Sequence, residues 1–512
     1  MASLLPVNNV VRGSPSASDT KKRVDFITEL PLEIVVCYIL PKILGSVCTL
    51  PKGVACFEWL AKRLRLPSLK DLTLTVTRAP LLMPPQVMAT GPSHSSASSH
   101  AMPEPLHLHH LLDHCPALVE LKIASKETIF IATSSRLSAT YPSIRHLELR
   151  YASPTGENPR NPFSIKYHVS PALFKHFPRL RLLALWYPQP RYHDMQTIFG
   201  YCPMLQQLFL GGIQKHSVPE CTTSLQRGLR LLSLHGPSSQ GNLIAQLLRD
   251  HSTTIKSLAM ECVGAWPSSA PILINDHVLF PRLQSLHLHR RMSRHPMAFI
   301  RAVIGQAPNL ESINVDNGGL QGEILETLIG KPVRSIDLVC TPWSNPASAL
   351  NFLDHHVQLG MRSTLQEVTC TITSDYEYRN TMRIMHPMAT FKDLGGGWML
   401  SIAALQQLQS LELSFEDDVY EQSLTTFLRL LSQRCPSLEN LTLAFYLSFN
   451  IEWLLPLSRH PKLKKMVIVS KRFPKYMTTL VQHFARLQAF DLKLKSTGRR
   501  GLPIDIPLSR FL

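Results

Sequence analysis

Residues 177–186 read FPRLRLLALW, and residues 202–210 read CPMLQQLFL. In both stretches a proline precedes a leucine, and two further leucines then occupy alternate positions. Proline cannot continue a helix, so a helix that precedes it ends there. Apolar residues at every second position point to one side of a short strand. Each stretch therefore predicts the end of a helix followed by a strand with one buried side.

The pattern L-x-x-L-x-L, with other apolar residues or Cys allowed, recurs along almost the whole chain. Its fifteen copies begin at Leu69, Leu118, Ile144, Leu180, Leu205, Leu229, Ile255, Leu283, Leu310, Val333, Leu365, Leu408, Leu438, Leu463 and Leu487. From Leu180 to Val333 the steps are 25, 24, 26, 28, 27 and 23 residues, within the range of leucine-rich repeats. One repeat cannot bury its own apolar side and must pack on its neighbours, so the strands are expected to stack in parallel.

The segments between the predicted strands have the period of amphipathic helices. Apolar stripes are formed by Leu243, Ile244, Leu247 and Leu248, by Ile300, Val303 and Ile304, and by Leu424, Phe427, Leu428 and Leu431. Alternating strands and helices predict an α/β leucine-rich-repeat horseshoe, with parallel strands on the concave face and helices outside.

The repeats span residues 67–495, and two stretches inside this range break their period. Residues 79–105 are rich in Pro, Ser and His, and residues 372–404 contain three consecutive glycines. We expect both stretches to be flexible insertions. Residues 1–24 and 496–512 are expected to form terminal tails, and residues 25–66 a small helical segment.

The segment 25–66 carries a second pattern. Leu30-Pro31-Leu32-Glu33-Ile34 is followed by Ile39-Leu40, and Trp59 lies 29 residues after Leu30. This segment resembles an F-box, and with the repeats the chain is similar to F-box proteins with leucine-rich repeats. The resemblance implies a substrate receptor of a cullin–RING (SCF-type) ubiquitin ligase, whose repeats bind a protein substrate. It also implies that the Skp-type adaptor is bound by Leu30, Pro31, Glu33, Ile34, Leu40 and Trp59.

A second interpretation of this segment stays open. Pro41 and Pro51 fall where F-box helices are expected, and proline ends or interrupts a helix. Residues 30–66 are therefore also compatible with a helical cap that shields the first repeat from water. In that case the chain is a repeat scaffold that binds proteins without a link to a ubiquitin ligase.

Composition and charge limit the compartment and the partners. Hydrophobic residues make up 44% and charged residues 17% of the chain, a globular balance. The longest apolar run, residues 34–40, is too short to cross a bilayer, so no membrane partner is expected. The ten cysteines form no C-x-x-C pair, which favours a reducing compartment, cytoplasmic or nuclear. The net charge of +17 is compatible with nucleic acid, but no RNA-recognition motif occurs, and we expect no nucleic-acid partner.

The sequence offers little that could support catalysis. The best candidate for a metal site is the cluster of His107, His109, His110 and His114, near which only Asp113 and Cys115 could complete a ligand set. We interpret the cluster as part of a solvated helix. No phosphate-binding glycine loop and no nucleophile elbow occurs. The sequence therefore predicts no enzyme, no cofactor and no metal.

The repeat register also assigns side chains to the inner face of the strands. Nine acidic residues fall there, namely Asp71, Glu120, Glu148, Glu261, Asp316, Asp337, Glu367, Glu412 and Asp491. Four basic residues accompany them, namely Lys122, Arg150, Lys465 and Lys493. The inner face is thus predicted to be acidic and to repel nucleic acid, and the excess Lys and Arg are expected on helices, loops and edges.

An apolar group on the inner face is the predicted substrate site. Leu182, Ala184 and Trp186 occupy inner positions of one predicted strand, Phe209 of the next and Leu231 of the one after. An exposed patch of this kind usually marks a partner site, with His235, His287 and His289 as a polar rim. The alternative is that the chain covers the patch itself, with residues 79–105 or 372–404.

Overall fold

The computed structural model describes residues 70–76, 112, 115–125, 139–151, 171–186, 191–211, 228–237, 241–263, 278–288, 297–315, 321–340, 346–372, 397–415, 421–445, 450–470, 482–484, 487, 489–494 and 504–506. The chain divides into two compact units, one of residues 1–64 and 76–104, the other of residues 65–75 and 105–512. The fold that follows is that of the second unit. The segment 25–66 and the insertion 79–105 lie outside the described residues.

The described strands form a single sheet of sixteen, in which the order of the strands is their order along the chain. Their bounds are β1 (Asp71–Val76), β2 (Glu120–Ser125), β3 (His146–Tyr151), β4 (Leu182–Trp186), β5 (Gln207–Leu210), β6 (Leu231–Pro237), β7 (Ser257–Val263), β8 (Ser285–Leu288), β9 (Ser312–Val315), β10 (Ser335–Cys340), β11 (Glu367–Ile372), β12 (Ser410–Phe415), β13 (Asn440–Phe445), β14 (Lys465–Ser470), β15 (Ala489–Leu494) and β16 (Ile504–Ile506). Neighbouring strands from β2 to β15 are parallel.

The first fifteen of these strands coincide with the fifteen predicted copies of the repeat, including the least regular ones at Val333 and Leu365. The sixteenth strand was not expected. It lies in the predicted tail 496–512 and pairs with β15 in the antiparallel direction. Three residues are too few to show an alternating pattern, so the sequence carried no signal for it.

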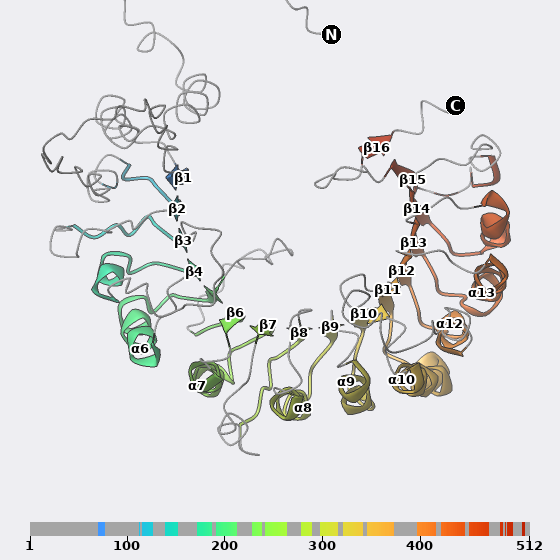
Figure 1. Ribbon diagram of the computed structural model, residues 1–512, viewed down its shortest axis with the longest axis horizontal. Helices are drawn as coiled ribbons and strands as arrows, with labels where there is room; N and C mark the ends of the chain where they lie inside the picture. The colour runs from blue at the N-terminus through green and yellow to red at the C-terminus, as the bar shows by residue number, and fades with distance from the viewer. Residues whose placement is uncertain are drawn as a thin grey trace, which may run out of the picture. The chain divides into compact units, whose positions relative to one another are not determined.

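Helices connect the strands and lie on one side of the sheet (Figure 1). The α-helices are α6 (Tyr192–Tyr201), α7 (Gly241–His251), α8 (Met297–Gly305), α9 (Gln321–Leu328), α10 (Pro346–Leu359), α12 (Gly397–Ala403) and α13 (Glu421–Arg434), and the 3₁₀ helices are η2 (Pro171–His176), η5 (Gly360–Arg362) and η6 (Ile451–Arg459). The predicted stripes lie in α7, α8 and α13 and are buried. The unit is therefore the predicted α/β leucine-rich-repeat horseshoe, with strands on the concave face.

The core lies between the sheet and the helices. Ile336, Val368 and Leu411 are successive partners on β10, β11 and β12, and each is at most 1% exposed. Fully burying one such side chain contributes about 2 kcal/mol. Because the partners belong to different repeats, each repeat completes the core of the next, as the pattern predicted.

Buried side chains in the turns before the strands also join neighbouring repeats. The Cys202 Sγ lies 3.5 Å from the carbonyl oxygen of Phe177, and the Cys435 Sγ lies 3.1 Å from that of Leu405, one repeat earlier in each case. Burial raises the pKa of both thiols to about 12, so they stay protonated and donate. In the repeat after Cys435, His460 takes the same position, and its Nε2 donates to the Cys435 carbonyl at 2.9 Å.

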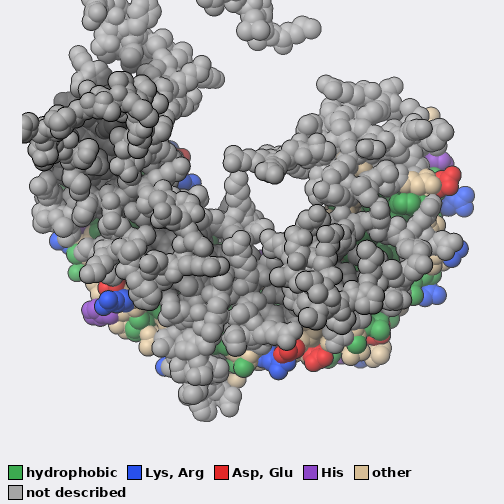
Figure 2. All heavy atoms as spheres, in the orientation of Figure 1, with side chains coloured by type: hydrophobic (Ala, Val, Ile, Leu, Met, Phe, Trp, Pro, Cys, Tyr) green, Lys and Arg blue, Asp and Glu red, His purple; other side chains and the backbone are tan. Residues whose placement is uncertain are grey.

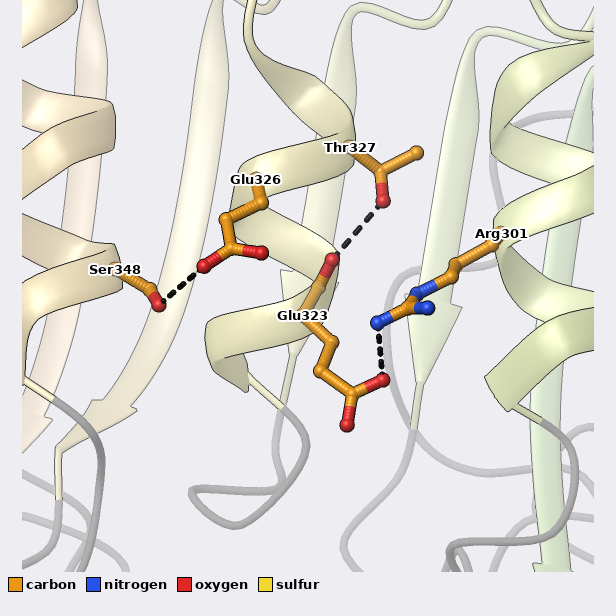
Figure 3. Close-up of polar contacts among 5 residues, drawn as sticks. All are labelled: Arg301, Glu323, Glu326, Thr327 and Ser348. Atoms are coloured by element: carbon orange, nitrogen blue, oxygen red, sulfur yellow. Dashed lines mark hydrogen bonds and ion pairs between the residues drawn. The ribbon is translucent and has the colours of Figure 1, made fainter.

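Polar contacts link the outer helices α8, α9 and α10 (Figure 3). Arg301 of α8 forms an ion pair with Glu323 of α9, and the hydroxyl of Ser348 in α10 donates to Glu326 of α9 at 3.0 Å. Figure 2 shows Lys, Arg, Asp and Glu side chains interspersed along this helical side. Exposed ion pairs of this kind contribute at most about 1 kcal/mol each, so the buried core sets the fold.

The insertion expected at 372–404 is shorter than predicted. Its last residues form helix α12, which begins at Gly397 directly after two further glycines. Trp398, Met399 and Ile402 of this helix are buried. The helix has seven residues, so the apolar spacing was too short to stand out against the glycines.

Candidate protein-binding surface

The inner face of the sheet is lined by the side chains that lie between the two core positions of each strand, here called the central row. From β3 to β6 its members are Glu148, Ala184, Phe209 and Ser233. From β7 to β13 they are Ala259, His287, Asn314, Asp337, Thr369, Glu412 and Thr442. The two sets differ in exposure, and we call β3–β6 the covered stretch and β7–β13 the open stretch.

In the covered stretch the central row is shielded from water. Glu148 is 2% exposed and Phe209 is 5% exposed. Phe209, Ala184 and Leu231 form one buried apolar cluster, against which the half-buried Leu182 packs. The predicted proximity of these side chains is confirmed, but the expectation that they form an exposed patch is wrong. Their burial agrees with the alternative that the chain covers the patch itself.

The predicted substrate residues outside this cluster are placed as follows. Trp186 is the last residue of β4, and His235 lies in β6 opposite Glu261 of β7. His287 lies in the central row of β8, and its Nε2 is 2.9 Å from the hydroxyl oxygen of Ser285. His289 and the adaptor residues Leu30, Pro31, Glu33, Ile34, Leu40 and Trp59 lie outside the described residues. A role in binding stays a prediction for all of them.

The central row of the open stretch is half-buried except at Glu412, which is exposed, and all its members except Ala259 are polar. The Nδ2 of Asn314 on β9 donates to the Oδ2 of Asp337 on β10 at 2.5 Å, which holds two central-row side chains in a fixed arrangement. Thr369 and Glu412 are register partners on β11 and β12, and Glu412 is exposed. This stretch offers hydrogen-bond donors and acceptors to a partner without first removing an apolar cover.

The charged side chains that water reaches in the open stretch are acidic. Glu367 and Glu412 are exposed on neighbouring strands, and Asp337 is half-exposed. The described central-row side chains from β7 to β13 include no Lys or Arg. This part of the surface matches the predicted acidic inner face and is unfavourable for phosphate groups.

Charges at the start of the sheet are paired or shielded instead. Lys122 and Glu120 of β2 form an ion pair, and the Nδ1 of His146 on β3 lies 3.9 Å from the Oε2 of Glu120. Burial lowers the pKa of His146, although Glu120 acts in the opposite direction. The inner face is therefore acidic and open from β7 to β13 rather than uniformly along its length, and Val467, the next central-row residue on β14, is buried again.

The row before the central row gives a signal for the open stretch that the sequence interpretation missed. Its members are small and hydroxylated in five repeats, namely Ser257, Ser285, Ser312, Ser335 and Ser410. In the covered stretch the corresponding residues are the larger Leu182, Gln207 and Leu231. A run of serines at one register position is typical of a solvated face.

Two further properties concern the part of the chain that the structure describes. No group of three or more His, Cys, Asp or Glu side chains is arranged there to hold a metal ion. The cluster His107, His109, His110 and His114 lies outside the described residues. Among the helices that the structure describes, none has the length and apolar character to cross a membrane.

Comparison with known proteins adds little to this geometry. No family model matches the chain. No curated protein is similar to it. Among solved structures, the chain is similar to one from a crystal of the Rad7 and Elc1 complex in yeast, with 16% sequence identity and a TM-score of 0.34. The similarity covers 59% of this chain and 72% of that one.

Proposed function

We propose that this protein is a binding subunit whose open stretch, β7–β13, recognises a protein substrate. The observation that carries the proposal is that water reaches the central row over seven neighbouring strands, and that every member of the row except Ala259 is polar. Parallel strands hold these side chains in a fixed register, so the surface is formed before a partner arrives. Preformed surfaces of this kind bind with little loss of conformational freedom.

The finer proposal is that the protein is the substrate-recognition subunit of a cullin–RING (SCF-type) ubiquitin ligase. It is supported by the resemblance of residues 25–66 to an F-box, in which Leu30 and Pro31 would bind the Skp-type adaptor. The repeats would then hold the substrate while the ligase modifies it. The protein itself supplies binding and no catalytic group.

An affinity-purification experiment tests both levels of the proposal. Thr369→Arg together with Glu412→Arg places two long cationic side chains on the open stretch. We expect this variant to lose its protein substrate, with a Kd raised at least about tenfold, while its melting temperature stays within a few degrees of the unmodified protein. Thr426→Arg with Glu452→Arg makes the same change of charge at exposed positions of α13 and η6, so it is the matched control and should keep the substrate.

The adaptor arm uses Leu30→Ala with Pro31→Ala in the full chain. Loss of adaptor and cullin with the substrate retained supports the ligase assignment. Retention of the adaptor in this variant counts against an F-box. A purification that yields the substrate but never an adaptor identifies the chain as a scaffold without a ligase link. Equal substrate binding by the open-stretch variant and its control would refute the binding surface itself.

A further inference from the structure

The residue immediately before each strand forms a second row, along one edge of the sheet, here called the edge row. The backbone N–H of Arg181 donates to the carbonyl oxygen of Arg145 at 2.7 Å. The same bond is repeated from Gln206 to Arg181, from Arg230 to Gln206 and from Lys256 to Arg230, at 2.9, 2.8 and 2.7 Å. Successive members therefore lie about 4.8 Å apart, the spacing of neighbouring strands.

Over β3–β7 the edge row is cationic. Four of its five members there are basic, and Arg179 adds a further charge in the turn before β4. We define the cationic edge as Arg145, Arg179, Arg181, Arg230 and Lys256. Arg145, Arg179 and Lys256 are exposed and Arg181 is half-buried. Within the described residues, none of these four side chains takes part in an ion pair.

The geometry of the edge row itself allows charges on adjacent strands to pair. Between β13 and β14, Glu439 and Lys464 occupy the same two positions, and their Oε2 and Nζ atoms are 2.8 Å apart. On the cationic edge the corresponding neighbours are both positive, as with Arg145 and Arg181. Like charges on adjacent strands destabilise a sheet, so this edge is poised to accept an anion.

The two ends of this edge row are accessible, whereas Gln206 between them is 3% exposed and the inner face of the same strands is shielded. The central row of β3–β6 is shielded, with Glu148 and Phe209 at most 5% exposed. The edge row of these strands keeps Arg145 exposed at one end and, on β7, Lys256 exposed at the other. A partner that reaches this part of the solenoid therefore meets guanidinium and ammonium groups first.

We propose that the cationic edge binds an extended acidic segment of a protein partner. From Arg145 to Lys256 the row advances four strands, about 19 Å, which matches about six residues of extended chain at about 3.3 Å each. Acidic residues at alternate positions of such a chain present their carboxylates on one side. Arginine binds carboxylates with two parallel hydrogen bonds, and three of the five members are exposed.

A protein segment fits this edge better than a single nucleic-acid strand does. Surfaces that bind single strands combine cations with aromatic side chains on which the bases stack. From β3 to β7 the edge row contains Arg, Lys and Gln, and no aromatic residue. This proposal shares one assumption with the proposed function, namely that the partner is a protein. It concerns other side chains than the central row of the open stretch.

The test measures binding of a fluorescent glutamate-rich peptide of about ten residues, longer than the span of about six residues derived from strand spacing. The unmodified chain is compared with Arg145→Glu, Arg179→Glu and Lys256→Glu combined. Exposed ion pairs are each worth a few-fold in affinity, so Kd should rise at least roughly tenfold, and unmodified binding should weaken with salt. The milder combination Arg145→Gln, Arg179→Gln and Lys256→Gln, with thermal melting of both variants, shows that the fold persists.

A matched control reverses three exposed charges elsewhere, Arg362→Glu, Arg429→Glu and Arg434→Glu, and should keep the peptide. Equal loss in the control, or no loss in the edge variants, overturns the proposal. Tighter binding of duplex DNA than of the peptide at the same salt concentration also overturns it, in favour of nucleic acid. The open-stretch variant Thr369→Arg with Glu412→Arg should bind the peptide normally. Failure of the proposed function would therefore appear as unchanged substrate binding in this variant, independently of how the edge variants bind the peptide.

Discussion

Phe209 provides a direct measure of whether the covered stretch is closed in solution. Its ring is 5% exposed and packs with Ala184 and Leu231, and Phe209→Ala removes the largest side chain of this cluster. Core Phe→Ala changes destabilise by about 3 to 5 kcal/mol. Half-buried Leu182 lies beside the cluster and can move into the space, so we expect the lower end, about 3 kcal/mol.

Hydrogen exchange of the backbone amides in β4, β5 and β6 is the suitable assay, because repeat arrays need not unfold in one step. A loss of about 3 kcal/mol corresponds to exchange faster by roughly 100-fold or more, since about 1.4 kcal/mol is a factor of ten. The control is Thr369→Ala, which changes a half-buried side chain at the same register position on β11 and should change stability by less than about 0.5 kcal/mol.

One result would refute this reasoning. If Phe209→Ala leaves exchange in β4–β6 unchanged while the affinity for the protein substrate falls, the ring is open to solvent and available to the substrate. The apolar patch inferred from the sequence would then be the binding site, and the open stretch would not.

Three further predictions follow from buried or constrained residues. Burial lowers the pKa of His356 to about 4, from about 6.5 in an unfolded chain, so the unfolded state binds the proton first as the pH falls. The free energy of unfolding should therefore fall by roughly 3 kcal/mol between pH 6.5 and pH 4. In His356→Gln, the midpoint of urea denaturation should depend less on pH over this range. Cys435→Ala removes the hydrogen bond to the Leu405 carbonyl and should lower the free energy of unfolding, measured by denaturation, by about 1 to 2 kcal/mol. Cys435→Ser keeps a donor at this position and should lose less stability. An equal loss in both variants would argue against the hydrogen bond. Gly228→Ala places a Cβ 2.9 Å from Thr254 at a φ of +109° and should destabilise by at least about 1 kcal/mol, with an unchanged melting temperature as the contrary result.

The repeat fold could be predicted from the sequence because its signal is repeated. One strand of three leucine positions is ambiguous, but errors at Val333 or Leu365 are corrected by neighbours in register. The turn prolines set the ends of helices in the same way, as at Pro203 after α6. The short helix α12 and strand β16 were missed because each lacks enough residues for a period.

The candidate site was predictable only in part. Alternation says which way Phe209 points, and it placed Phe209 beside Leu231 correctly. It does not say whether something else lies over that side chain, because a covering segment can be distant in sequence and carries no register with the strand. The side of the sheet to which a side chain points follows from the local alternation along its strand. Whether that side is buried depends on the tertiary structure.

The strand order of the sheet, identical to the order along the chain, has a consequence for how signals travel in this molecule. Each repeat contacts the one before and the one after, so a perturbation in one repeat is transmitted from neighbour to neighbour and weakens with each interface. A substrate seated near β11 would stiffen the repeats beside it and leave those around β4 almost as they were. The open stretch and the cationic edge can thus respond to different partners.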